Sequence, residues 1–304
     1  MKVASLFCGC GGLDLGFLQA GYDIVWANDF DKYAVQTYNS NFSHSAICAD
    51  INEVDLYSIP EHDALIGGFP CQPFSMMGKE QGFKDYRGTL FFKVIEIINN
   101  QLERGHQPKI VVLENVRNLL SHDKGRTFLI MKESLEALGY HVFSAKLNSA
   151  DYGVPQTRNR VFLVCLLDNV EYTFPSPVAL DCTMQDILEE SVDEKYFLSD
   201  RILNTILSNG TGGYYAKSEI DLSIARPLTA TMAKMHRACQ DNYVTQKDKI
   251  RRLTPRECAR LQGFPDSFSI EVSDTQAYKQ FGNAVTVTVS YAIAKSILEQ
   301  VKND

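Results

Sequence analysis

The chain has no long apolar run and no segment typical of a secretion signal. None of its apolar stretches approaches the roughly 20 residues that cross a bilayer. Its N-terminus also lacks a basic segment followed by an apolar core. We therefore expect a cytoplasmic protein with no membrane partner.

Paired cysteine motifs are absent as well. The eight cysteines are scattered over 304 residues, without the C-x-x-C pairs of zinc sites and without the density of a disulfide-linked domain. We expect reduced thiols and no bound metal.

Positive charge is in deficit over the whole chain. The 30 lysines and arginines stand against 37 acidic residues, which gives a net charge of −7. Taken alone, this charge argues against a nucleic-acid partner, because phosphate binding needs cations. Between residues 247 and 260, however, basic residues outnumber acidic ones, and the segment has a net charge of about +4. This segment, which includes Arg251 and Arg252, could follow a phosphate backbone or form the solvated face of a helix.

Alternating β-rich and helical segments fill the first half of the chain. The β-rich runs are 3–7, 24–28, 64–67 and 110–113, and the helical patterns that follow them are 12–20, 32–39, 89–102 and 127–138. This alternation predicts an α/β fold with a doubly wound, mostly parallel sheet. The runs 141–147 and 160–167 could pair as an antiparallel edge, which would make the sheet mixed.

After Phe174-Pro175-Ser176-Pro177, the alternation of β-rich and helical segments ends, and short irregular segments with a glycine cluster follow. We predict a larger domain from residues 1–182 plus 283–304 and a smaller, loop-rich domain from residues 183–254. Residues 255–282 are predicted to form a hinge between them. The closing helical pattern at 285–301 is expected to return to the larger domain.

A glycine-rich segment, Phe7-Cys8-Gly9-Cys10-Gly11-Gly12, follows the first strand and opens the first helix. Such a loop presents free amides to an anionic ligand. It would suit the pyrophosphate of a dinucleotide or the carboxylate of S-adenosylmethionine. The dinucleotide fingerprint G-x-G-x-x-G fails at its third glycine, where Asp14 stands. Asp29, at the end of the second strand, could hold ribose hydroxyls with either ligand.

A cysteine stands where the apolar run 64–69 ends, in Pro70-Cys71-Gln72. A reactive thiolate needs partial exposure, and the junction of a strand and a loop provides it. A cysteine chosen at random is more often a small buried apolar residue. The following segment, 78–88, is polar and punctuated by glycine, so we expect a loop that could close over a substrate.

Two further segments supply a carboxyl group and two guanidinium groups. The apolar run 110–113 ends in Glu114, at the same predicted sheet edge as Cys71. A carboxyl in an apolar pocket has a raised pKa and can donate a proton. Arg158 and Arg160 are two residues apart, on one face of an extended segment. They could hold a carbonyl, a phosphate or the Glu114 carboxylate.

Methylation of carbon 5 of cytosine requires these groups together. Carbon 5 becomes nucleophilic only after a thiolate, here Cys71, adds to carbon 6. Glu114 would stabilise the charge at ring nitrogen 3. Arg160 would hold the carbonyl oxygen at position 2, and Arg158 would order the neighbouring carboxylate. Proton loss from carbon 5 and elimination of Cys71 would release 5-methylcytosine.

Six segments, in this order, resemble the motifs of bacterial DNA (cytosine-5)-methyltransferases of the restriction-modification type. They are Phe7–Gly12, Gly68–Gln72, Glu114–Val116, Gln156–Arg160, Arg251–Pro265 and Phe281–Val285. The resemblance implies a Rossmann-like class I fold that binds S-adenosylmethionine, with the larger domain catalytic and the smaller one reading the DNA target. It implies that Cys71 is the nucleophile and that Glu114, Arg158 and Arg160 complete the catalytic set.

Two larger sets of residues are expected to bind the cofactor and the DNA. The expected cofactor-binding residues are Phe7, Gly9, Gly11, Gly12, Asp29, Phe30, Asp50, Ile51, Gly68, Pro70, Asn283 and Ala284.

The expected DNA-binding residues have three origins. The resemblance implies that Gln72, Ser75, Lys79 and Arg87 reach the DNA. The loops 208–217 and 229–242 are expected to read the site, through Tyr214, Lys234, His236 and Arg237. Arg251 and Arg252 are expected as phosphate contacts and as scaffold between the domains.

The expected substrate is double-stranded DNA with the target cytosine rotated out of the helix. Two alternatives remain: a tRNA cytosine-5 methyltransferase, whose expected Cys-Phe-Thr in the second domain does not occur here, and a catalytically silent DNA-binding relative. A dehydrogenase would leave Pro70-Cys71-Gln72 unexplained. We further expect a monomer associated with the nucleoid of a prokaryote, with a cognate restriction endonuclease as a functional partner.

Overall fold

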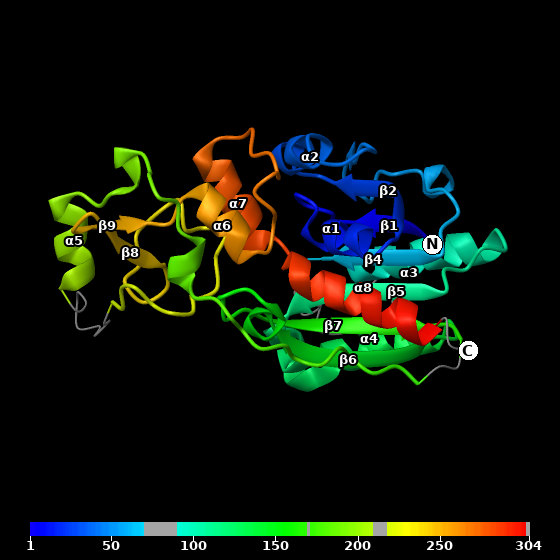
Figure 1. Cartoon of the computed structure of the whole chain (residues 1–304). Helices are drawn as coiled ribbons and strands as arrows, with labels where there is room; N and C mark the ends of the chain where they lie inside the picture. Colours follow the sequence, from blue (N-terminus) through cyan, green and yellow to red (C-terminus); the bar gives the residue numbers. More distant parts are fainter. Residues whose placement is uncertain (70–89, 169–170, 209–217, 302–304) are drawn as a thin grey trace.

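A seven-stranded sheet forms the centre of the larger part of the molecule in the computed structural model, which describes residues 1–69, 90–168, 171–208 and 218–301 (Figure 1). The strand order is β3-β2-β1-β4-β5-β7-β6. The strands are β1 (Lys2–Leu6), β2 (Asp23–Asp29), β3 (Ile47–Cys48), β4 (Ala64–Gly68), β5 (Ile110–Val116), β6 (His141–Asn148) and β7 (Asn159–Leu166). All neighbours are parallel except β7, which runs antiparallel to both β5 and β6. The predicted doubly wound, mixed sheet is confirmed.

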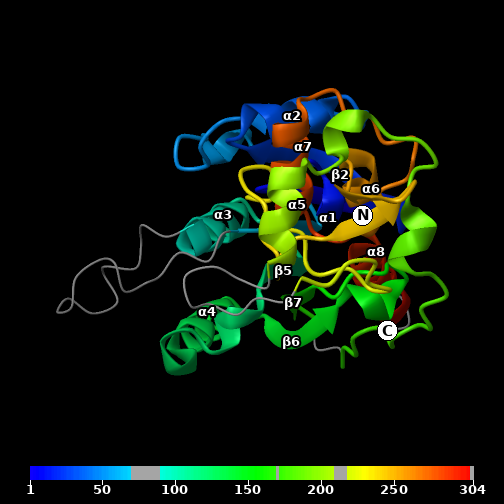
Figure 2. The same cartoon turned by 90° about the vertical axis from the view of Figure 1, so that its left-hand side faces the viewer.

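Helices cover both faces of this sheet. They are α1 (Gly12–Gln19), α2 (Lys32–Asn39), α3 (Leu90–Glu103), α4 (Arg126–Glu136) and α8 (Val287–Val301). Alternate residues of a strand point to opposite faces, so Ile110 packs in the core with α1 and α8, and Val111 packs in the core with α3 and α4. Figure 2 shows α3 and α4 on one side of the sheet and α8 on the other. The fold is therefore a three-layer α/β sandwich.

The contact between α1 and α8 is unusually close. A Cβ atom added at Gly16 would lie 2.5 Å from the side chain of Ser290 on α8. The Ser290 hydroxyl in turn donates a hydrogen bond of 2.6 Å to the carbonyl of Leu13. Glycine at position 16 thus lets the last helix of the chain lie directly against the first.

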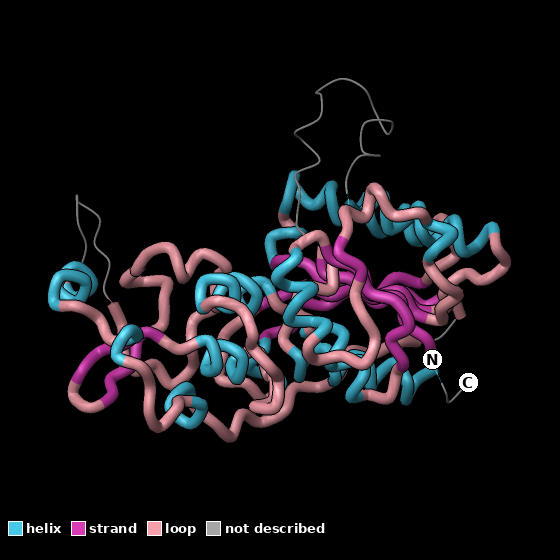
Figure 3. Tube along the Cα trace, turned by 90° about the horizontal axis from the view of Figure 1, so that it is seen from above, coloured by secondary structure: helices cyan, strands magenta, loops and turns pink. Residues whose placement is uncertain are grey.

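The smaller lobe, residues 183–208 and 218–254 of the described chain, consists mostly of loops (Figure 3). Its regular elements are α5 (Asp200–Leu207) and an antiparallel hairpin of β8 (Tyr243–Gln246) and β9 (Lys249–Arg252). Two helices, α6 (Pro255–Leu261) and α7 (Asp274–Asn283), lie between this lobe and the sheet (Figure 1). Short 3-10 turns occur at Leu56–Ser58, Arg117–Leu120, His122–Gly125, Ser149–Tyr152, Met184–Ile187 and Glu194–Tyr196.

One apolar core joins the smaller lobe to the larger part of the molecule. Val244 and Leu253 of the lobe share this core with Phe281 of α7 and with Tyr38 of α2. Helix α6 begins at a capping box in which Thr254 and Glu257 satisfy each other's backbone amides. The hairpin therefore passes into α6 by a fixed turn. No helix among the described residues is both long and apolar enough to cross a membrane.

Candidate active site

The strand order reverses direction between β1 and β4, and the crevice at such a switch point is where α/β sheets bind ligands. Phe7 and the glycine-rich loop leave β1 at this point, and Gly11 is the N-cap of α1. A Cβ atom at Gly9 would meet nothing within 4 Å. The backbone here is open to a ligand, next to the helix N-terminus that favours an anionic group.

Asp29, at the end of β2, connects the glycine-rich loop to the neighbouring strands. Its carboxylate accepts hydrogen bonds from the amides of Gly9, at 2.9 Å, and Asp31, at 2.8 Å. Burial raises the pKa of Asp29, and these two hydrogen bonds oppose the shift. The Asp29 carbonyl also accepts from the amide of Ala49, so the segment that carries Asp50 and Ile51 lies alongside it.

The side chains around Asp29 differ sharply in exposure. Phe30 is 74% exposed, although it is a large apolar residue. Asp50 is also exposed, whereas Ile51 is buried in the core beneath it. An exposed aromatic ring beside two carboxylates fits a nucleoside, whose base stacks and whose ribose donates hydrogen bonds. These residues therefore fit S-adenosylmethionine.

The chain returns to this crevice after α7. Asn283 is exposed and Ala284 is buried. A Cβ atom at Gly12 would lie 2.2 Å from the carbonyl oxygen of Val285, so this segment closes directly over the start of α1. The structure thus brings residues 7–12, 29–30, 50–51 and 283–284 to one edge of the sheet.

Glu114 lies on β5, one strand further along the same edge. It pairs with Gly68 on β4 and with Phe162 on β7. Its Oε1 accepts a hydrogen bond of 2.9 Å from Nε of Arg160. Burial raises the pKa of Glu114, although the charges of Arg160 and Arg158 oppose the shift. A carboxyl group in this environment can retain a proton and donate it.

Arg158, which was expected to order the Glu114 carboxylate, does not form a hydrogen bond with that group in the described part of the chain. Its guanidinium is buried and donates hydrogen bonds to three main-chain carbonyls, those of Leu228, Gly282 and Ala284. It acts on Glu114 only through its charge, and Arg160 makes the hydrogen bond. Main-chain carbonyls engage both terminal nitrogens of the guanidinium, whereas its buried Nε has no hydrogen-bond partner among the described residues, so the ordering of the carboxylate by Arg158 stays a prediction.

Some of the expected residues lie outside the described part of the chain. They are Pro70, Cys71, Gln72, Ser75, Lys79, Arg87 and Tyr214. The last described residue before Cys71 is nevertheless fixed: the carbonyl of Phe69 accepts a hydrogen bond of 2.9 Å from the side-chain amide of Asn115. Since Asn115 follows Glu114, the described segment that ends at Phe69 is attached beside the strand that carries the buried carboxyl group.

Four of the expected DNA-binding residues gather in the smaller lobe. Lys234 is exposed, and His236 stacks on Tyr243. Arg237 donates hydrogen bonds to the Thr229 hydroxyl and to the Asp241 carboxylate. Arg252 lies over the ring of Tyr278 and donates to the carbonyl of Met232.

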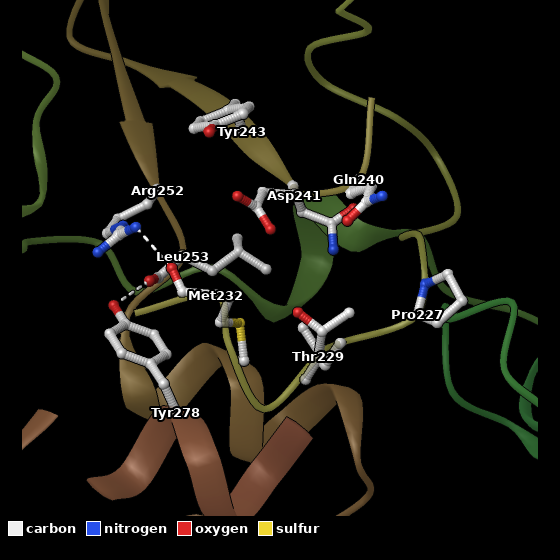
Figure 4. A pocket seen from close by; sticks show the side chains of 11 residues that line it. Pro227, Thr229, Met232, Gln240, Asp241, Tyr243, Arg252, Leu253 and Tyr278 are labelled. Carbon is white, nitrogen blue, oxygen red and sulfur yellow. Dashed lines mark hydrogen bonds between the residues drawn. The ribbon is translucent and has the colours of Figure 1, made fainter. Parts of the chain in front are cut away.

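A pocket lies at the base of this group, between the hairpin and α7. Figure 4 shows Asp241, Tyr243 and Arg252 on one side of it and Thr229 and Met232 on the other. The pocket therefore places polar side chains on both walls of a partly apolar hollow.

Arg251 corrects an expectation from the sequence. Its side chain is 0% exposed, and two of its nitrogens each lie 2.7 Å from the carboxylate oxygens of Glu257, which is also wholly buried. A residue enclosed in this way cannot reach a phosphate group. Its predicted role in DNA binding is wrong, and Arg252, its partly exposed neighbour, keeps that role as a prediction.

Two residues that were given no role hold the site together. Asn115 fixes the Phe69 carbonyl, as described above. Gln156 is wholly buried, accepts a hydrogen bond from the amide of Leu228 and donates to the carbonyl of Leu261. Both residues lie within the motifs Glu114–Val116 and Gln156–Arg160, and this position in the sequence was the signal that could have identified them.

No group of three or more His, Cys, Asp or Glu in the described residues could hold a metal ion.

Known proteins similar to this chain fall into one family. The model of the family described as C-5 cytosine-specific DNA methylase matches residues 1–299. The Type II methyltransferase M.NlaX of Neisseria lactamica is 41% identical over 307 residues, which cover 97% of this chain and 96% of that protein. The Type II methyltransferase M.HhaI of Haemophilus parahaemolyticus is 36% identical, covering 98% and 94%.

Solved structures show the same fold. The crystal structure of the S. pombe Dnmt2 methyltransferase superposes with a TM-score of 0.82 over 98% of this chain and 99% of that one, at 22% identity. The Entamoeba histolytica methyltransferase EhMeth gives 0.81, with coverage of 99% and 98%, at 19% identity. The sheet-containing part and the smaller lobe of this chain therefore both have counterparts in these solved structures, in the same arrangement.

Proposed function

Because the chain belongs to the C-5 cytosine-specific DNA methylase family, it methylates carbon 5 of cytosine in DNA with S-adenosylmethionine as donor, and we propose which residues carry out this reaction. The single observation that supports the assignment is the ion pair of the buried Glu114 with Arg160, beside the strand that leads to Cys71. A tRNA-methylating or silent protein is not favoured.

The Cys71 thiolate adds to carbon 6 of a cytosine rotated out of the duplex, which moves electron density toward ring nitrogen 3. Protonated Glu114 donates to this nitrogen, and the Arg160 guanidinium, held in place by the same carboxyl group, donates to the oxygen at position 2. S-adenosylmethionine supplies the methyl group. The proton on carbon 5 then passes to a base as the bond between carbon 6 and Cys71 breaks, which restores the aromatic ring.

Replacing Glu114 by glutamine is expected to lower kcat by about 100-fold, because the amide can donate a hydrogen bond but not a proton. The raised pKa of Glu114 should produce a loss of activity in the native enzyme as pH rises through that pKa and the carboxyl ionises. This loss should disappear in Glu114→Gln. Methyl transfer measured from pH 5 to 9 tests this.

The matched control is Glu96→Gln, at a carboxylate that pairs with Lys93 on the surface of α3. It should change neither kcat nor the pH profile. A Glu114→Gln protein with the native pH profile would contradict the role of Glu114 as the acid.

For cofactor binding, we propose that Asp29 and Asp50 bind the ribose and amino groups and that Phe30 and Ile51 contact the adenine ring. The glycine-rich loop at residues 7–12 would receive the carboxylate end, where the amides at the start of α1 favour negative charge. Gly68, Pro70, Asn283 and Ala284 would line the side of the crevice that faces the substrate. The open backbone at Gly9 and the exposed ring of Phe30 support this arrangement.

Phe30→Ala is expected to raise the Kd for S-adenosylmethionine by about 10-fold through loss of base stacking. The melting temperature of the protein without cofactor should stay unchanged, because the ring is 74% exposed. Tyr57→Ala, at an aromatic residue that is 69% exposed on another turn, is the matched control and should leave the Kd unaltered. Isothermal titration calorimetry measures both values. Equal Kd values for native and Phe30→Ala protein would remove Phe30 from the site.

For DNA binding, we propose that residues 183–254 read the target, with residues 255–282 as the hinge to a catalytic domain formed by 1–182 and 283–304. Lys234, His236, Arg237 and Arg252 would contact the duplex, and Tyr214 would belong to the same surface. Gln72, Ser75, Lys79 and Arg87 would reach the DNA when the segment after Cys71 closes. Bisulfite sequencing of plasmid DNA methylated by the enzyme would identify the site that is read.

We also propose that the protein works as a monomer in the bacterial cytoplasm, bound to the nucleoid and accompanied by a restriction endonuclease for the same site. The Type II names of its relatives support the last point. Light scattering of the complex with duplex DNA tests whether the protein is a monomer, since a monomer should bind with one chain per site.

A further inference from the structure

We propose that Gln156 and Arg158 are positioning residues that couple the smaller lobe to the catalytic pair through the segment Pro227–Met232, here called the reading segment. In this arrangement, a shift of the reading segment on DNA is passed on to Glu114 and Arg160, which keep their paired geometry only when the segment is seated correctly. The inference rests on the proposed roles of Glu114 and Arg160.

The peptide groups on both sides of Leu228 are held from the same short strand. The amide of Leu228 donates to Oε1 of Gln156 at 2.9 Å, and its carbonyl accepts from Nη1 of Arg158 at 3.0 Å. Main-chain hydrogen bonds between Thr157 and Ala225 and between Ala225 and Pro155 extend this contact. The segment before Pro227 thus forms an isolated parallel β-bridge, between Ala225 and Gln156, with the residues that lead into β7.

The same two side chains are fixed on their other side by helices α6 and α7. Arg158 also donates to the carbonyls of Gly282 and Ala284, at 3.1 and 2.9 Å, where α7 ends. Gln156 donates to the carbonyl of Leu261 at the end of α6. Because a guanidinium is planar and its donors have fixed directions, Arg158 cannot keep all three carbonyls if one of them shifts.

Arg160 lies two residues beyond Arg158 and holds the Glu114 carboxyl group. A displacement of the strand at residues 156–158 therefore reaches the catalytic pair through one intervening residue. A displacement of less than about 1 Å is sufficient to lower the reaction rate, because the rate depends steeply on the positions of the catalytic groups.

The far end of the reading segment meets the proposed DNA-contacting residues. Arg237 donates to the Thr229 hydroxyl at 2.7 Å, and Arg252 donates to the Met232 carbonyl at 2.9 Å. Thr229 and Met232 form one wall of the pocket in Figure 4. DNA that draws Arg237 or Arg252 toward a phosphate or a base would release or shift the segment at that end.

The segment has little room to absorb such a shift locally. A Cβ atom at Gly282 would lie 2.3 Å from the backbone of Thr229 and Ala230, so α7 and the reading segment already touch. A tightly packed contact passes displacement on rather than absorbing it. The buried Leu228 peptide is the point through which it would pass.

The first test compares two DNA duplexes, one with the mapped target site and one with a single base pair of that site changed. Arg158→Lys keeps the charge, but its single ammonium nitrogen cannot replace the two guanidinium nitrogens that reach the three carbonyls from separate positions. It should lower kcat on the target site by about 100-fold and reduce the ratio of kcat/KM between the two duplexes by about 10-fold. Arg104→Lys, at an arginine that donates to the Ile59 carbonyl far from the site, is the matched control and should change neither value.

A fall in kcat of equal proportion on both duplexes, or an unchanged kcat, would overturn the coupling. Covalent trapping on 5-fluorocytosine DNA separates this outcome from failure of the proposed function. The native protein must form that adduct if Cys71 is the nucleophile, and Arg158→Lys should form it more slowly on the target site.

A double-mutant cycle provides the second test. Thr229→Ala removes the hydroxyl that Arg237 holds. If the reading segment connects the two sites, the effects of Thr229→Ala and Arg158→Lys on kcat/KM should be non-additive by about 5-fold. Purely additive effects would show that Arg158 acts without the segment and would contradict the proposal.

Discussion

Cys71→Ser is expected to abolish methyl transfer, with a loss on the order of 10⁴-fold. A serine hydroxyl has a pKa far above that of a thiol, so the alkoxide needed to attack carbon 6 is not available near neutral pH. Binding of S-adenosylmethionine and of DNA should persist, because the substitution removes one reacting atom and leaves the two binding surfaces intact. Transfer of labelled methyl groups to duplex DNA measures the loss.

Other cysteines of this chain supply the control. Cys48 and Cys239 are exposed, and replacing either by serine should leave transfer unchanged. Duplex DNA with 5-fluorocytosine at the target should trap the native protein covalently, since fluorine cannot leave as a proton does. Undiminished transfer by Cys71→Ser, or trapping of that variant, would exclude Cys71 as the nucleophile.

Arg251→Met and Glu257→Gln are each expected to lower the free energy of unfolding by about 3–5 kcal/mol, because each leaves a buried charge without its partner. The two side chains are wholly buried and joined by two hydrogen bonds of 2.7 Å. Glu257 also accepts from the amides of Thr254 and Glu189. Chemical denaturation followed by circular dichroism measures the change.

An exposed ion pair between the hairpin and the turn at Glu194–Tyr196 provides the comparison. Lys249 and Glu194 are 3.7 Å apart and largely solvated, so Lys249→Gln should cost less than about 1 kcal/mol. The double variant Arg251→Met/Glu257→Leu should regain part of the stability, because it leaves neither charge unpaired. Losses below 1 kcal/mol for Arg251→Met would show that the pair does not hold the hairpin to α6.

Much of the larger domain can be predicted from the sequence because its strands have strong periodic signals. The runs at 64–67 and 110–113 became β4 and β5, parallel neighbours. Parallel neighbours end at the same edge, so the juxtaposition of Gly68 and Glu114 follows from the strand assignments alone. The expected antiparallel pairing of the runs at 141–147 and 160–167 is also present, as β6 and β7, but it does not determine which of the two lies next to β5.

The sequence could not distinguish a buried arginine from an exposed one. A cluster of basic residues is usually solvated, and Arg251 was therefore expected at the surface. Its carboxylate partner, Glu257, is six residues away and belongs to the capping box that begins α6. Only the turn between β9 and α6 brings the two together, and a turn of this kind has no periodic signal.

The contact of Arg160, rather than Arg158, with Glu114 could not be predicted for a similar reason. Their spacing places both on one face of an extended segment, but it does not say which one meets Glu114. The carbonyls that engage Arg158 come from residues 228, 282 and 284, more than 60 positions further along the chain. Such long-range contacts depend on the packing of the smaller lobe and of α7.

The close contact of α1 with α8 has a consequence for how the enzyme is made. The first helix carries the cofactor loop at its start, yet the apolar side of that helix is covered by α8, and the hydrogen bond between the two helices joins residues 277 positions apart. Domains fold as units during synthesis, so this one cannot be completed until α8 emerges from the ribosome. A nascent chain should therefore be unable to bind its methyl donor before α8 has been made.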